Sequence, residues 1–116
     1  MKTLATLAGL LLSLLAAPAA LADVGGSCHF HGNKPASEAI VSDCATQRKN
    51  ALVKAGKLPA SWQSVKIEQA ELVDGKKAKE WKVTFKNPAA PDAAKQTLYL
   101  FFSQPGNFIA ANHTGQ

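Results

Sequence analysis

Apolar and polar residues follow two different periods along this chain, and these periods predict a helix followed by strands. Across residues 37–55, apolar positions recur every three or four residues, which is typical of an amphipathic helix that packs on a core. Ser37 is a suitable N-cap, and Gly56 suits the left-handed position after a helix. The expected inward positions are Ile40, Val41, Cys44, Ala45, Arg48, Leu52 and Ala55.

Beyond Pro59, the apolar period changes to the two-residue alternation of strands. Residues 65–72 alternate until the parity slips near Gln69, which predicts either a bulge or an early end to that strand. A turn at Asp74 leads into residues 81–86, which alternate cleanly. Before these strands, Trp62 is expected to cover one end of the core.

Two apolar runs flank Gln104 to Asn107 near the end of the chain, and they predict a hairpin across residues 97–113. Residues 87–96, which precede it, are expected to form a surface loop because they contain two prolines and no apolar period. The sequence therefore predicts an α+β fold in which one N-terminal amphipathic helix packs on a three- to four-stranded antiparallel sheet.

The predicted hairpin register places Gln104 opposite Asn107 and divides the remaining residues between two faces. The inward set is Leu98, Leu100, Phe102, Ile109, Ala111 and His113. The outward set is Tyr99, Phe101, Ser103, Phe108, Ala110 and Asn112. Because Tyr99, Phe101 and Phe108 make this outward face unusually apolar, they are a candidate surface for a protein partner or for a second copy in a homodimer. The alternative is a monomer with a partly exposed aromatic face.

Residues 1–22 have the pattern of a secretory signal peptide, with one early lysine, an apolar core and small residues before Asp23. The apolar core is shorter than the roughly 20 residues of a membrane helix, so no membrane span is expected after cleavage. The expected location is the periplasm. The chain then divides into residues 1–22 as signal peptide, residues 23–35 as a Cys- and His-containing arm, and residues 36–116 as a single domain.

The charge of the chain is mildly basic, with a formal net charge of +5. Several lysines crowd residues 76–86, where they indicate either an anionic partner or protection of a sheet edge from pairing with other chains. A nucleic-acid partner is not expected, because the chain is predicted to be exported and interleaves no aromatic and basic readout residues.

One cluster carries recognisable chemistry. Cys28, His29 and His31 place a thiol and two imidazoles within four residues, and this donor set suits zinc or copper. In an extended chain the two histidines would lie on one side and reach the same ion. A fourth ligand would come from Cys44 or His113.

The competing interpretation is a disulfide between Cys28 and Cys44, which an oxidising compartment favours. The bridge would remove both thiolates, and a metal site would then depend on His29, His31 and His113. A solvated arm without any site is the remaining alternative. No catalytic residue is predicted, because the chain shows no set of nucleophile, base and orienting group.

Four segments carry a resemblance to known families. They are the helix start Ser37-Glu38-Ala39, the turn Ala60-Ser61-Trp62, the strand at 81–86 and the hairpin strand at 98–103. The chain resembles PepSY domains and, more closely, a group of small bacterial periplasmic proteins of unassigned function with a His-rich arm. The resemblance implies a non-enzymatic role in sensing, binding or peptidase restraint at the cell envelope. The first hypothesis is a periplasmic accessory or binding protein that holds a metal on its arm. The second is a PepSY-like module that binds a protein through its sheet.

Overall fold

The computed structural model describes residues 28–116 of the chain. The predicted signal peptide at 1–22 and the first part of the arm, 23–27, lie outside the described residues. Within residues 28–116, no helix has both the length and the apolar character that a membrane crossing requires.

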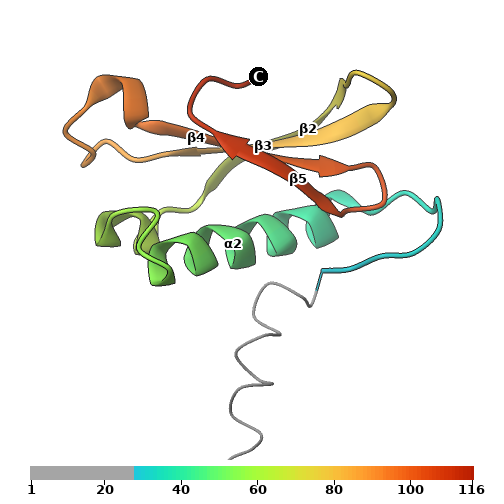
Figure 1. Cartoon of the computed structure of the whole chain (residues 1–116), viewed down its shortest axis with the longest axis horizontal. Coiled ribbons are helices and arrows are strands. Elements are labelled where there is room, and N and C mark those ends of the chain that lie inside the picture. Colours follow the sequence, from blue (N-terminus) through green and yellow to red (C-terminus); the bar gives the residue numbers. More distant parts are fainter. Residues whose placement is uncertain (1–27) are drawn as a thin grey trace, which may run out of the picture.

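One helix lies across one face of an antiparallel sheet, with the sheet above it in Figure 1. Four strands form the sheet in the order β2-β3-β4-β5, so that each pairs with its neighbour in the chain. The elements are α2 (Glu38–Lys54), η2 (Ala60–Ser64), β2 (Ile67–Asp74), β3 (Lys79–Lys86), η3 (Ala93–Lys95), β4 (Thr97–Ser103) and β5 (Phe108–Asn112). The predicted α+β fold, with one helix on an antiparallel sheet, is confirmed.

Both ends of α2 follow the local signals in the sequence. The Ser37 hydroxyl accepts a hydrogen bond of 3.2 Å from the Ile40 N–H, which is the expected N-cap. Gly56 has φ of 77°, and the Lys57 N–H donates to the Leu52 carbonyl at 2.9 Å, closing the last turn. The helix therefore begins and ends where the predicted caps place it.

The buried face of α2 differs from the predicted stripe at three positions. Val41, Cys44 and Ala45 are buried as expected. Ile40 is 44% exposed and Ala55 at the C-cap is also exposed, so the inward placement of these two was wrong. Lys49 is buried instead. It lies one turn after Ala45 and two turns after Val41, on the same side of the helix. The buried stripe therefore follows positions 41, 45 and 49 and leaves Ile40 to one side.

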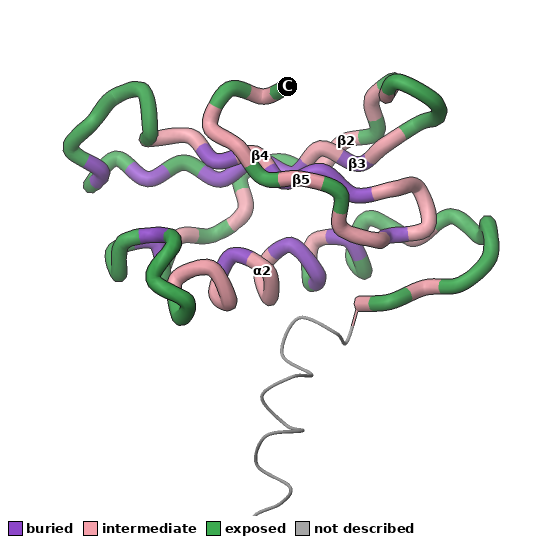
Figure 2. Tube along the Cα trace, viewed as in Figure 1, coloured by how far each residue is buried: buried purple, intermediate pink, exposed green. Residues whose placement is uncertain are grey.

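The core lies between α2 and the sheet, where Figure 2 shows purple segments on both layers. Trp62 on η2 is 1% exposed, which confirms its predicted position over the core. The inward alternation of β3 is also confirmed. The buried core cluster is Val41, Cys44, Ala45, Leu58, Trp62, Trp81, Val83, Phe85, Leu98, Leu100 and Phe102.

The parity slip in the first strand is a bulge. The β2–β3 register shifts between Ile67 and Gln69, and β2 then continues to Asp74. The bulge lets Ile67 and Ala70 both face the core although three positions separate them. Of the two alternatives drawn from the sequence, the bulge is therefore the one adopted.

The loop between β3 and β4 is partly buried and hydrogen-bonded to the rest of the domain, unlike the surface loop that the sequence predicts. Asn87 is 2% exposed, its N–H donates to the Gln96 carbonyl at 2.7 Å, and its side chain donates to the Ser61 hydroxyl at 3.0 Å. Ala90 is also buried. The loop is thus tied to η2 and forms part of the wall of the domain.

The predicted register of the last hairpin is confirmed along the strands and wrong next to the turn. Leu100 pairs with Ala111 and Phe101 with Ala110, as predicted. Ser103, not Gln104, lies opposite Asn107, since the Ser103 N–H donates to the Asn107 carbonyl at 2.7 Å. The same one-residue offset pairs Phe102 with Phe108, and it ends at a bulge between Phe101 and Phe102. The rings of Phe102 and Phe108 meet edge to face at 5.8 Å, so Phe108 packs against the core. Because the bulge absorbs one residue, Ile109 is 48% exposed. Ala111 pairs with Leu100 as predicted but is exposed on the edge strand β5.

The outer face of the sheet is partly covered by the chain itself. Phe101 is only 7% exposed there, and Tyr99 is half-buried. Gly115 lies so close to Tyr99 that a Cβ atom on it would be 3.3 Å from the ring. In Figure 1 the C-terminus lies on the side of the sheet opposite α2, which is consistent with this contact.

Candidate functional site on the N-terminal arm

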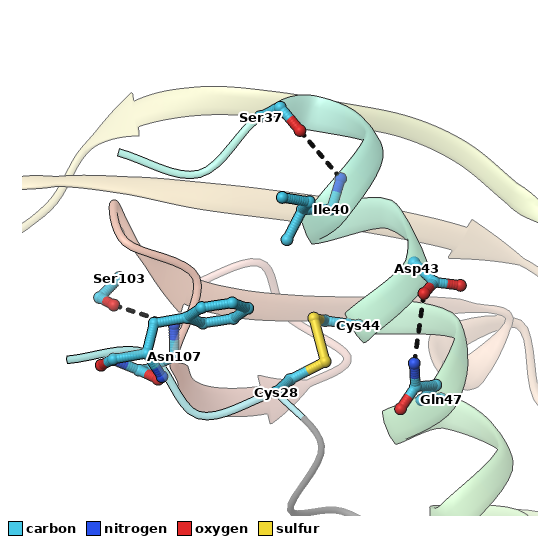
Figure 3. Close-up of a disulfide and its surroundings, with 9 residues drawn as sticks. Cys28, Ser37, Ile40, Asp43, Cys44, Gln47, Ser103 and Asn107 are labelled. Carbon is cyan, nitrogen blue, oxygen red and sulfur yellow. Dashed lines mark hydrogen bonds between the residues drawn. A yellow bond between two sulfur atoms is a disulfide. The ribbon is translucent and has the colours of Figure 1, made fainter. Parts of the chain in front are cut away.

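The arm is attached to α2 by a disulfide between Cys28 and Cys44, which Figure 3 shows as a yellow bond. Their Cα atoms are 5.9 Å apart, within the ordinary range for a bridge. The predicted disulfide is confirmed. Neither sulfur is therefore available as a thiolate ligand in this state, and the four-ligand set that includes a cysteine was wrong for it.

A second attachment joins the arm to the tip of the β4–β5 hairpin. The Phe30 N–H donates to Asn107 Oδ1, and Asn107 Nδ2 donates to the Phe30 carbonyl, both at 2.8 Å. A carboxamide group has a carbonyl oxygen that accepts and an NH2 group that donates. It can therefore bond to both the N–H and the carbonyl of one residue, as the backbone of a neighbouring strand would. Asn107 is itself positioned by its own N–H, which donates to the Ser103 hydroxyl at 3.0 Å, as Figure 3 shows.

The hairpin turn is shaped to receive the Phe30 ring. Gly106 has φ of 110°, and a Cβ atom on it would lie 3.1 Å from that ring. Only glycine combines this backbone conformation with this close approach. The Ala36 N–H also donates to the Gln104 carbonyl at 2.9 Å, which closes the arm against the turn from its other end.

These attachments set the orientation of the two histidines. Phe30 packs against the core, whereas His29 and His31 on either side of it are exposed. Both histidines line one cleft of about 360 Å³, together with Lys34, Pro35, Ile40 and Pro105. Alternate residues of an extended segment lie roughly 7 Å apart. The structure therefore brings His29 and His31 together as the alternation predicted.

His113 does not join them. Its Nδ1 lies 2.7 Å from the Thr97 carbonyl oxygen, and its ring lies 6.3 Å from that of Trp62. Thr97 begins β4, whereas the arm contacts Gln104 just beyond the end of that strand, roughly 20 Å away at the rise of a strand. A single site made of all three histidines was therefore wrong. Across residues 28–116, no group of three or more His, Cys, Asp or Glu residues is arranged to hold a metal ion.

The predicted partner surface is divided by the hairpin register. Tyr99 and Phe101 lie on the outer face as expected, but Phe108 lies on the core side, where the Arg48 guanidinium stacks 4.1 Å above its ring. On the outer face, the Lys82 ammonium lies 4.8 Å from the centre of the Tyr99 ring. The aromatic residues thus form no continuous exposed face of three rings.

A groove of about 670 Å³ does cross the outer face, beside the turn between β2 and β3. Its apolar lining comes from Val73, Phe101, Ile109 and Ala110, and the last residues of the chain border it. The sequence predicted an apolar outer face but not this shape, because the shape depends on the bulge at Ile109 and on the C-terminal segment.

Sequence reasoning missed Lys49. Its ammonium donates to the carbonyls of Trp62 at 2.7 Å and Gln63 at 3.0 Å, so it ties α2 to the end of η2. Burial, together with the nearby charge of Lys66, lowers the pKa of Lys49. The line of Val41 and Ala45 extends to Lys49 with a spacing of four residues, and this spacing was the available signal.

Comparisons with known proteins give a family without a known role. No curated protein and no solved structure matches this chain. The likeness to PepSY domains has no support from these comparisons and stays an interpretation. A family profile described as a family of unknown function, DUF6488, matches residues 1–116, in agreement with the expectation of a family of unassigned function. The chain belongs to the DUF6488 family.

Proposed function

We propose that this protein is a non-enzymatic periplasmic binding protein that holds a transition-metal ion between His29 and His31. The observation that carries the proposal is the fixed orientation of the arm, whose two imidazoles line one cleft while Phe30 between them is anchored to Asn107. Anchoring reduces the conformational entropy that the arm would otherwise lose when it binds an ion.

The donor set indicates the class of ion. Neutral imidazole suits zinc and copper(II), and two such ligands leave further coordination positions for water or for a partner. A site of this kind binds reversibly and suits an accessory that holds or passes on a metal. Export through a signal peptide is part of the proposal, because it would place the site in a compartment that favours formation of the Cys28–Cys44 disulfide.

Titration with zinc or copper(II), followed by NMR, tests the proposal. At micromolar metal, the imidazole signals of His29 and His31 are expected to respond first, and those of His113 are expected to stay unchanged. His29→Ala and His31→Ala should each weaken binding strongly, whereas His113→Ala removes the same chemical group at a distant point and serves as the matched control. Equal affinities in all three variants would refute the proposal.

Lys34 provides an independent check of the location. It lines the same cleft and carries the same sign of charge as the metal. Lys34→Ala should therefore strengthen metal binding by about 0.2 to 1 kcal/mol, the usual size of an exposed charge interaction, and the gain should shrink at high salt. Lys57→Ala, at the far end of α2, should have no such effect. An equal gain in both variants would mean that the ion binds elsewhere.

A second candidate function is favoured by the groove on the outer face. A PepSY-like module would bind a protein or restrain a peptidase through its sheet, and Phe101 and Ile109 in this groove offer apolar contacts for it. In that case the arm would only be tethered by its disulfide. Ile109→Asp should then abolish capture of the partner while leaving the zinc response of His29 and His31 intact. Retained capture in Ile109→Asp would count against this candidate.

A further inference from the structure

We propose that the Cys28–Cys44 disulfide switches the histidine site between two sets of ligands. In the oxidised protein the ligands are His29 and His31, and reduction adds the sulfur of Cys28 to them. This inference rests on the proposed function, because it concerns the same site and extends it to a third ligand.

The arm has attachments that reduction leaves intact. The two hydrogen bonds between Phe30 and Asn107 and the bond from the Ala36 N–H to the Gln104 carbonyl do not involve either sulfur. The arm therefore stays on the hairpin when the disulfide is cut. Cys28 remains tethered two residues from Phe30, close to both histidines.

The disulfide determines which way Cys28 points. In the oxidised protein Cys28 and Phe30 both pack against the core, while His29 and His31 face outward. Cutting the bond removes the covalent link that holds Cys28 against α2, so the Cys28 side chain is free to turn toward the histidines. Cys44 is 4% exposed on the buried face of α2 and has no comparable freedom.

A dithiol reductant supplies the electrons and protons that reduce the disulfide. One thiolate of the reductant attacks the half-buried Cys28 sulfur, the bond to Cys44 breaks, and Cys44 leaves as a thiolate that takes up a proton. The second thiol of the reductant then displaces Cys28 from the mixed disulfide. Two electrons and two protons pass to the protein, and the reductant becomes a disulfide. Zinc then replaces the proton on Cys28.

The two states differ in metal preference. Two imidazoles bind zinc or copper(II) through nitrogen alone, whereas thiolate with two imidazoles suits zinc and copper(I) and binds more tightly. The effect is reciprocal, because a metal that prefers the reduced protein must favour reduction to the same extent. Each tenfold gain in zinc affinity shifts the reduction potential of the disulfide by about 30 mV toward the reduced form.

The test compares two variants that both lack the bridge and differ only in which sulfur remains. Cys44→Ala keeps Cys28, and Cys28→Ala keeps Cys44. Cadmium serves as the probe because a sulfur ligand gives it a charge-transfer absorption, and zinc affinity is measured alongside. The full exported protein is used in each case, and the wild type is also measured with and without a phosphine reductant, which keeps the experiment informative if either variant fails to fold.

The expected result is sulfur-to-cadmium absorption in Cys44→Ala and in the reduced wild type, and none in Cys28→Ala or in the oxidised wild type. Zinc should bind the first pair more tightly by a factor on the order of ten or more, since even an outer-shell partner of a metal ligand is worth that much. Absorption in Cys28→Ala, or none in Cys44→Ala and the reduced wild type, overturns the switch. A failure of the oxidised wild type to bind zinc through His29 and His31 instead overturns the proposed function, so the two failures are distinguishable.

Discussion

The side chain of Asn107 holds the backbone of Phe30 through two hydrogen bonds of 2.8 Å, although 77 residues separate them in the sequence. Through this contact the last hairpin of the chain positions the N-terminal arm. The contact lies between His29 and His31, so it also determines the geometry of the proposed metal site.

Replacing Asn107 should loosen the arm around Phe30 without unfolding the domain. Asn107→Asp keeps the acceptor for the Phe30 N–H but loses the donor to the Phe30 carbonyl, and we expect a loss of about 1 kcal/mol in the free energy of unfolding. Amide hydrogen exchange of residues 29–31 should rise more than that of β3. Asn33→Ala, an exposed change on the same arm, is the control. Unchanged exchange in Asn107→Asp would show that the other attachments position the arm without Asn107.

Removing the disulfide should cost more than removing the Asn107 contact. The bridge spans a sequence separation of 16 residues, and the loop-entropy model assigns it about 3 kcal/mol. We expect the double variant Cys28→Ala with Cys44→Ala to lose roughly that amount, as measured by urea unfolding. A domain this small depends on such cross-links because its core is limited. Equal stability of variant and wild type would mean that the disulfide contributes nothing to the stability of the fold.

The corrected hairpin register makes a prediction about two neighbouring residues. Phe108 packs on Phe102 and under Arg48, so Phe108→Ala should destabilise the protein by about 2 to 3 kcal/mol. Ile109→Ala removes a side chain that is 48% exposed and should cost about 0.5 kcal/mol or less. Urea unfolding of both variants checks the order. An unbulged pairing that turns Ile109 inward and Phe108 outward requires the opposite order.

Lys49 should be required for the junction of α2 and η2. Lys49→Met keeps much of the volume but leaves the carbonyls of Trp62 and Gln63 without their charged donor, at a cost of about 1 to 2 kcal/mol. Lys49→Ala adds a cavity and should cost about 2 to 4 kcal/mol. Lys54→Met, in the exposed last turn of α2, is the control and should change little.

Because its pKa is lowered, the contribution of Lys49 to the free energy of unfolding depends on pH. Because the folded protein binds this proton less tightly than the unfolded chain, the unfolded chain carries more protons between the lowered pKa and the ordinary value of 10.5. The contribution of Lys49 to stability therefore rises with pH across that window and is constant below it. The stability lost in Lys49→Met relative to wild type should be larger at about pH 10 than at neutral pH. A difference that shrinks as the pH rises would contradict the assignment.

Much of the candidate site could be predicted from local sequence. The exposure of His29 and His31 on one side follows from alternation in an extended segment, and the pairing of Cys28 with Cys44 follows from there being two cysteines in the chain. The distance of His113 could not be predicted. It depends on where the last hairpin lies relative to the arm, and no local pattern encodes that distance.

The sequence by itself determined the helix with its Ser37 cap and Gly56 end, the inward alternation of β3 and the position of the irregularity in β2, because caps and periodicity act between residues that are close in the chain. The tertiary structure alone decided the burial of Lys49, the core-side position of Phe108 and the hydrogen bonds between the Asn107 side chain and the Phe30 backbone. These features depend on a one-residue shift in strand pairing and on groups that meet only after folding. Such a shift turns a side chain to the other face of the sheet without changing the apolar pattern from which the strand was predicted.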